Sequence, residues 1–257
     1  MKGRQRKNKR PTLWLILAAA GLVLLGVVLA LVLGRTADSS DPSPLQEEDQ
    51  NLSPAEDPAA AEIPGWSLFS REERALGQNL WITAIGSYTG AFVEDGSDRA
   101  VENVLAVMVT NRGQADVQYA EFVLNVSGGS AQFKLTTLTA GATVLVLESN
   151  AAAFQTADYG TVVLTTCAFF EKERSLYPEQ FQLETTDGII NLTNVGEAVS
   201  GDVFVYYKAA VNGVFLGGIT YRARVAGGLD AGEIRQMMSE HYSKENSKVL
   251  FLTYASE

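Results

Sequence analysis

The chain has 257 residues, of which 46% are hydrophobic and 19% are charged, a composition typical of a folded protein. Its charge is unevenly distributed, because the first 35 residues hold seven of the 20 basic residues and none of the 30 acidic ones, which leaves a net charge of −17 on the remainder. A body of that charge repels phosphate backbones, so nucleic acid is excluded as an expected partner.

The first predicted element is a membrane anchor. Residues 1–12 form a basic tail with six positive charges, and residues 13–33 (LWLILAAAGLVLLGVVLALVL) contain no charged side chain. A helix of this length spans roughly 30 Å, the thickness of the hydrocarbon core of a bilayer. We therefore expect a transmembrane helix in contact with membrane lipid, and cleavage as a signal peptide near Ala37 is the alternative.

A disordered linker outside the plasma membrane is predicted next. Basic residues precede the apolar segment and acidic residues follow it, a bias that places the N-terminus in the cytoplasm and residues 34–257 on the extracytoplasmic side. Residues 34–65 are rich in Pro, Ala, Ser, Asp and Glu, with eight acidic residues and no basic one from Thr36 to Gly65. Such a segment buries too little apolar surface to fold, so it would hold the folded part away from the membrane.

A short helix is predicted for residues 66–77. In the stretch SREERALG, Ser70 and Glu73 have the spacing of a capping box, in which two side chains bond the free backbone amides at a helix start. Gly77 follows as a residue type that commonly ends a helix.

Strand patterns dominate the rest of the chain. Residues 131–136 and 219–225 alternate apolar and polar side chains, as strands with one solvent-facing side do. Asn212 and Gly213 predict a tight hairpin turn, because both central positions of such a turn need positive φ. The stretch Ser127–Ser130 predicts a second hairpin for the same reason.

Three short patterns recur in the same order, which indicates an internal repeat. TNxGxA occurs at Thr110–Ala115 and Thr193–Ala198, LxAG at Leu138–Gly141 and Leu229–Gly232, and an apolar strand pattern begins at Gly160 and at Ser247. We predict two tandem copies of one module, residues 78–174 and 175–257. The repeat also favours a strand for residues 233–242, where helical spacing is present as well, because the first copy is β-branched at that place.

The order of strands and turns resembles that of bacterial immunoglobulin-like modules of the cell-adhesion-related and FxLYD-like type. This resemblance implies an extracytoplasmic β-sandwich and no particular activity. About 80–100 residues per copy also suits a sandwich of seven strands. The predicted fold class is therefore all-β, with two tandem immunoglobulin-like β-sandwich modules after an N-terminal transmembrane helix and a disordered linker.

Side chains with catalytic chemistry are few. His241 is the only histidine and Cys167 the only cysteine, and the nucleophile-elbow, phosphate-loop and HExxH patterns are all absent. We expect Cys167 to act as a small buried apolar residue and His241 to lie at an edge or on the surface. No catalytic site and no cofactor are expected, so the chain is not predicted to be an enzyme.

Two groups of residues are candidate sites for ligands. Glu94, Asp95 and Asp98 are the best metal candidates, because hard oxygen ligands on a loop suit Ca²⁺. A solvated Asp-Gly turn is the favoured explanation, because the spacing matches no known calcium loop. Tyr206, Tyr207 and Tyr221 could form a binding face for a glycan or a peptide. Core packing is the default expectation for one strand face, since Tyr207 shares a face with two valines and Tyr206 lies on the other.

These patterns predict a membrane-anchored, extracytoplasmic, non-catalytic binding, adhesion or scaffold protein of the bacterial cell envelope. Its partner would be an envelope protein or a glycan. An accessory subunit of a membrane transport or secretion complex is the main alternative, and a cell-wall hydrolase is a minor one.

Overall fold

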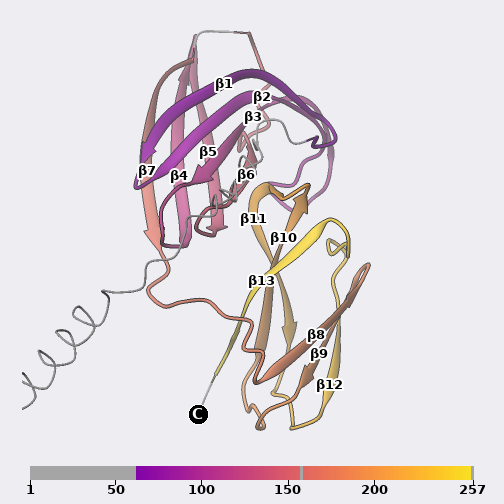
Figure 1. The fold of residues 1–257 in the computed structure, drawn as a ribbon. Helices are drawn as coiled ribbons and strands as arrows, with labels where there is room; N and C mark the ends of the chain where they lie inside the picture. Colours follow the sequence, from indigo (N-terminus) through magenta and orange to yellow (C-terminus); the bar gives the residue numbers. More distant parts are fainter. Residues whose placement is uncertain (1–61, 157–158, 256–257) are drawn as a thin grey trace, which may run out of the picture. The chain divides into compact units, whose positions relative to one another are not determined.

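A computed structural model of the chain describes residues 62–156 and 159–255 (Figure 1). These residues belong to one compact unit, Ser53–Glu257. The expected basic tail 1–12, the apolar segment 13–33 and nearly all of the linker 34–65 lie outside the described residues. Within the described ranges, no helix has the length and apolar character needed to cross a membrane.

The described region is all-β. We call residues 62–169 the first half and residues 170–255 the second half. The strands of the first half are β1 (Trp66–Gly77), β2 (Leu80–Ala91), β3 (Ala100–Asn111), β4 (Val117–Val126), β5 (Gly129–Leu138), β6 (Thr143–Leu147) and β7 (Tyr159–Phe169). Those of the second half are β8 (Phe181–Thr186), β9 (Ile189–Asn194), β10 (Val203–Val211), β11 (Val214–Val225), β12 (Ile234–Met238) and β13 (Ser247–Tyr254).

The strands form three sheets with the orders β1-β2-β3-β6-β11-β10-β13, β12-β9-β8 and β5-β4-β7. The pairing order recurs between the halves. β3 pairs with β2 and β6 as β9 pairs with β8 and β12, and β4 pairs with β5 and β7 as β10 pairs with β11 and β13. In each half two sheets enclose a core, an arrangement consistent with a β-sandwich.

The main core of the first half lies between its two sheets, where Phe122 and Phe133 stack with ring centroids 5.0 Å apart. β3 is buried on both faces. Its residues 105, 107 and 109 belong to this core, and residues 104, 106 and 108 to a second cluster around Phe92. A strand covered on both sides needs apolar residues at every position, which explains the unbroken run VLAVMV.

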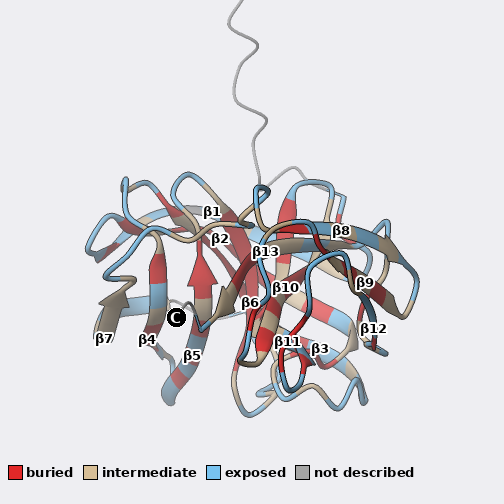
Figure 2. Cartoon of the chain, turned by 90° about the horizontal axis from the view of Figure 1, so that it is seen from below, coloured by how far each residue is buried: buried red, intermediate tan, exposed pale blue. Residues whose placement is uncertain are grey.

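The second half has a core of its own. Val203, Val205 and Tyr207 of β10 pack there with Ile190 and Leu192 of β9. Phe204 and Tyr206, at alternate positions of β10, are partly exposed, as expected for a strand with one buried face, whereas Lys208 further along that face is buried. Figure 2 shows such buried and less buried stretches on strands of both halves.

The helix prediction for residues 66–77 was wrong, because this segment is the strand β1. It pairs with β2 from Trp66↔Tyr88 to Gly77↔Leu80, and Gln78 and Asn79 make the turn with φ of 52° and 60°. A capping box contributes about 1 kcal/mol, which is small beside a backbone ladder along a 12-residue strand. The free energy gained by pairing with the buried strand β2 therefore outweighs the local preference for a helix.

Other strand predictions are confirmed. The Asn212-Gly213 turn joins Val211 to Val214 with φ of 50° and 80°, and a second hairpin pairs Val126 with Gly129. The ambiguous segment 233–242 contains the strand β12, as the repeat indicated.

The repeated TNxGxA and LxAG patterns meet through a buried asparagine in each half. Asn111 donates from Nδ2 to the carbonyl oxygens of Ala115 (2.9 Å) and Leu138 (3.1 Å), and its Oδ1 accepts from the Gly113 amide (2.9 Å). In the second half, Asn194 donates to the carbonyl oxygens of Glu197 (2.7 Å) and Leu229 (2.9 Å). Its Oδ1 likewise accepts from the amide two residues on, at 3.1 Å. The turn is thus built by the shared Asn, Gly and Leu and not by the Arg112 side chain.

One sheet runs through both halves because the hairpin of β10 and β11 extends beyond the second half (Figure 1). Phe215 and Leu216 of β11 pair in parallel with Val144 and Leu145 of β6. The Phe215 side chain lies in the core of the first half. The two halves therefore share backbone hydrogen bonds and apolar packing.

Candidate functional site

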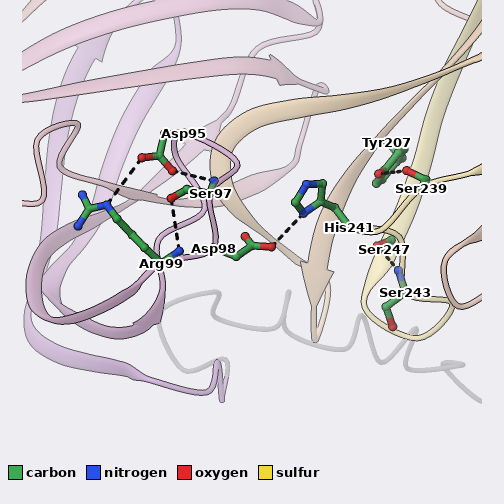
Figure 3. Close-up of polar contacts among 9 residues, drawn as sticks. All are labelled: Asp95, Ser97, Asp98, Arg99, Tyr207, Ser239, His241, Ser243 and Ser247. Carbon is green, nitrogen blue, oxygen red and sulfur yellow. Dashed lines mark hydrogen bonds and ion pairs between the residues drawn. The ribbon is translucent and has the colours of Figure 1, made fainter.

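The predicted tyrosine face is divided between two sides of a sheet. Tyr207 is 1% exposed in the second-half core and stacks on Tyr221 with ring centroids 5.3 Å apart. Its hydroxyl bonds to that of Ser239 (Figure 3). Burial raises the pKa of both tyrosines. Tyr206 lies on the opposite face, because successive strand residues point to opposite sides, and it alone of the three lines a groove.

We call this depression the junction groove, since residues of both halves line it. Its volume is about 330 Å³. The lining residues are Gln118, Thr136 and Thr137 of the first half, and Phe170, Arg174, Tyr206, Thr220, Phe251 and Thr253 of the second. None of them is acidic, although the body as a whole is strongly acidic.

Aromatic rings form one wall of the junction groove. Tyr206 of β10 and Phe251 of β13 are register partners, and their rings stack with centroids 4.5 Å apart and planes 18° apart. Phe170 approaches Phe251 edge-on at 5.4 Å. Neighbouring strands thus hold two rings, and the segment before β8 adds the third.

Arg174 supplies the positive charge of the groove. Its guanidinium lies 4.6 Å from the ring centre of Phe170 and 5.7 Å from that of Phe251, distances at which a cation is attracted to an aromatic face. The Nε group donates to the carbonyl oxygen of Lys172 (3.2 Å). Among the described residues no carboxylate forms an ion pair with Arg174, so the two terminal nitrogens remain available.

Lys208 lies behind the groove and is fully buried. Its Nζ donates to the carbonyl oxygens of Thr136 (2.9 Å), Gly218 (2.9 Å) and Ile219 (2.7 Å), so all three ammonium hydrogens are used. The β11 residues between Leu216 and Tyr221 bulge opposite Lys208, which brings these carbonyls to it. The ammonium therefore fixes the wall formed by Thr136 and its neighbours.

Glu94 is the carboxylate whose charge acts on Lys208. Its Oε1 accepts from the Leu147 amide and its Oε2 from the Gly218 amide, both at 2.7 Å. Desolvation raises the pKa of Glu94, while the two amides and the charge of Lys208 lower it. Desolvation lowers the pKa of Lys208, and Glu94 opposes that shift. Gly218 thus receives a hydrogen bond from one charged side chain and donates one to the other.

The structure does not bring Glu94, Asp95 and Asp98 together as metal ligands. Glu94 bonds backbone amides, whereas Asp95 Oδ1 accepts from the Ser97 amide (2.9 Å) and its Oδ2 lies 3.8 Å from Arg99 Nε (Figure 3). Hydrogen bonds from Ser97 lower the pKa of Asp95. Within the part of the chain that is described, no three or more His, Cys, Asp or Glu side chains are grouped to hold a metal ion.

Asp98 instead pairs with His241, at 2.9 Å between Oδ2 and Nδ1 (Figure 3). The imidazole stacks on Tyr221 with centroids 4.6 Å apart, so this contact joins a loop of the first half to the turn after β12. No described serine or cysteine side chain bonds to the His241 ring, so the aspartate and histidine lack the nucleophile of a hydrolytic triad. Cys167 packs partly buried against the first-half core, and burial raises its pKa.

Most of the groove was not identified from the sequence. The alternation of residues 131–136 placed Thr136 on a solvent-facing side, and Tyr206 was a candidate. Arg174 and Phe170 lie in a segment without strand periodicity, and nothing in the pattern around Phe251 distinguished it from a core residue. Their position side by side depends on strand pairing and on the path of the chain before β8.

Comparisons of the chain with protein-family models, with curated proteins and with solved structures each find no match. Function is therefore argued from the residues of this chain.

Proposed function

We propose that this protein is a membrane-anchored, extracytoplasmic binding or scaffold protein of the bacterial cell envelope, and that it has no catalytic role. The junction groove is the observation that carries the proposal. It combines aromatic rings, hydroxyl groups and one guanidinium, which are groups that hold a ligand. It contains no acid–base pair and no nucleophile beside a base, which a hydrolase would need.

The anchor is supported by the sequence alone. Residues 13–33 have the length and apolar character of a membrane-spanning helix, and the basic tail before them favours a cytoplasmic N-terminus. The acidic linker 34–65 would then hold the described region outside the plasma membrane.

We further propose that residues 78–174 and 175–257, whose bounds differ by a few residues from the division between the halves, are tandem immunoglobulin-like modules. The recurrent pairing order of the strands supports this, and so do the matching hydrogen bonds of Asn111 and Asn194. β1 is an additional strand of the first half. Because β11 pairs with β6, the modules would act as one rigid body, which suits a scaffold.

A protease test on cells examines the orientation. The full chain carries a C-terminal tag. Protease is added to cells from which any outer membrane or cell wall that blocks its access has been removed. Loss of the tagged body in intact cells, with a cytoplasmic marker protein unharmed, is the expected result. Protection of the body until the cells are lysed would overturn the proposed localisation.

An accessory role in a membrane transport or secretion complex is the second candidate. Small residues in the apolar segment, Ala18–Gly21 and Gly26, would allow close packing against another helix. Crosslinking of the full chain in membranes, followed by purification in mild detergent, separates the two functions. A stable partner crosslinked through residues 13–33 supports the complex, whereas recovery of the chain alone supports the free-standing binding protein.

A further inference from the structure

We propose that the junction groove binds an acidic sugar, with the carboxylate on Arg174 and the sugar ring against the aromatic wall. This inference rests on the proposed binding function and names its ligand class. The charge of the groove favours an anion. Arg174 is the only charged residue that lines the groove, while the chain beyond residue 35 has a net charge of −17. An anion is attracted locally, whereas a dense polyanion is repelled by the rest of the body.

The geometry of Arg174 favours a carboxylate. The guanidinium is held in place by Phe170 and Phe251 and by the bond from Nε to Lys172. Its two terminal nitrogens have no ion-pair partner among the described residues. A planar fork of this kind binds the two oxygens of a carboxylate in parallel, and little rotational freedom is lost because the side chain is already positioned.

The other walls suit a sugar. Tyr206 and Phe170 are the partly exposed members of the aromatic wall, whereas Phe251 is buried. The C–H bonds of a sugar face pack on the electron-rich face of an aromatic ring. Gln118 and Thr253 line the groove, and their side chains form no hydrogen bond with described residues. Amide and hydroxyl groups donate and accept, as the hydroxyls of a sugar require.

A sugar fits better than a peptide that adds as a strand. Strand addition needs a free backbone edge beside the groove. The amide of Leu252, between the groove residues Phe251 and Thr253, already donates to the carbonyl oxygen of Ser175 (3.0 Å). The volume of about 330 Å³ is at the small end of ligand sites, which favours a short ligand.

Titration of the full chain in detergent micelles tests this proposal. The probes are glucuronic acid with glucose as its neutral counterpart, and N-acetylmuramic acid with N-acetylglucosamine. Binding is measured by calorimetry and by saturation-transfer NMR. We expect at least one acidic sugar to bind about tenfold or more tightly than its neutral counterpart, because a charge-assisted pair is lost in the latter.

Variants place the ligand in the groove. R174A is expected to lower the affinity for the acidic sugar about tenfold or more, and Y206A to weaken the binding of both members of a pair. Both variants are measured below the midpoint of their own thermal unfolding, where they are folded. R224A is the matched control, because Arg224 is a β11 arginine that pairs with Asp202, lies opposite Phe204 and not opposite Tyr206, and does not line the groove. Its affinity is expected to stay within about twofold of the parent chain.

The outcomes separate this proposal from the proposed function. Equal binding of acidic and neutral sugars, or an R174A variant with full affinity, would overturn the acidic-sugar site. Binding of a triglutamate peptide without any sugar binding would also overturn it, while the binding function would stand. Protection of the body from protease in intact cells would overturn the envelope function without changing the sugar result.

Discussion

The ammonium group of Lys208 in the second half donates a hydrogen bond of 2.9 Å to the carbonyl oxygen of Thr136 in the first half. Thr136 in turn bonds through its hydroxyl to Thr220 at 2.9 Å. A fully buried cation thus connects β5 with the bulge of β11 and supports one wall of the junction groove.

Replacement of Lys208 by methionine keeps the apolar stem and removes the three donors. The carbonyl oxygens of Thr136, Gly218 and Ile219 then lose the ammonium as a donor, and Glu94 loses a nearby cation. The Thr136 and Gly218 oxygens keep one hydroxyl donor each, at 3.2 Å and 3.0 Å. We expect the free energy of unfolding to fall by about 3–5 kcal/mol, as when one member of a buried charged network is removed. Chemical denaturation measures the change.

The control for this variant is K134M on β5. Lys134 is 53% exposed and lies 3.7 Å from Glu121, so its loss should cost less than about 1 kcal/mol. Equal losses for K208M and K134M would show that the buried hydrogen bonds of Lys208 stabilise the fold no more than a surface ion pair does.

The raised pKa of Glu94 predicts a dependence of stability on pH. Folding favours the protonated form of this carboxyl, so its contribution is fully present below 4.5, the ordinary pKa. The contribution is lost as the pH rises from there through the folded-state pKa, because only the unfolded chain ionises freely. Denaturation at pH 5, 6, 7 and 8 should show the stability of the parent falling relative to E94Q. A constant difference between the two proteins would contradict the prediction.

The buried asparagines are expected to make similar contributions to stability, although Asn194 Oδ1 also accepts a hydrogen bond from Gln180 Nε2 at 2.6 Å. N111A and N194A each remove hydrogen bonds to a turn amide and to two carbonyls, and each should lower the free energy of unfolding by about 2–4 kcal/mol, because buried polar groups lose their partners. R112V is the control, since the second half has valine there and the Arg112 side chain makes surface contacts, an ion pair with Glu73 and a cation–π contact with Trp81 at 4.8 Å. It should cost less than about 1 kcal/mol. Thermal and chemical unfolding of the three variants provides the measurement, and a large effect of R112V alone would reverse this assignment.

Calcium is expected to leave the protein unchanged. The carboxylates of Glu94, Asp95 and Asp98 bond to separate partners, so a cation would have to break those bonds to bind. The midpoint of thermal unfolding should be the same in millimolar Ca²⁺, in Mg²⁺ and in chelator. A calcium-specific rise that disappears in D95N would restore the predicted metal site.

Local sequence patterns predicted the structure correctly where long-range packing favours the same structure. The alternation in residues 131–136 and the Asn212-Gly213 turn predicted real strands and a real hairpin, because the same residues that favour the local structure also satisfy the core. The capping box before Gly77 failed because β2 offered pairing along the whole segment. Tyr207 lies in the core of the second half and Tyr206 lies on the opposite face of β10, as the alternation of side chains along a strand requires.

The sequence by itself determined the β class, the turns and the repeated asparagine motif, because these depend on side-chain periodicity and on the φ angles that Asn and Gly tolerate. Only the tertiary structure decided the contents of the junction groove and the partners of Lys208. Thr136, Arg174 and Phe251 are far apart in the chain and share no local pattern. Strand pairing across the two halves brings them together, and long-range pairing depends on the packing of the whole molecule.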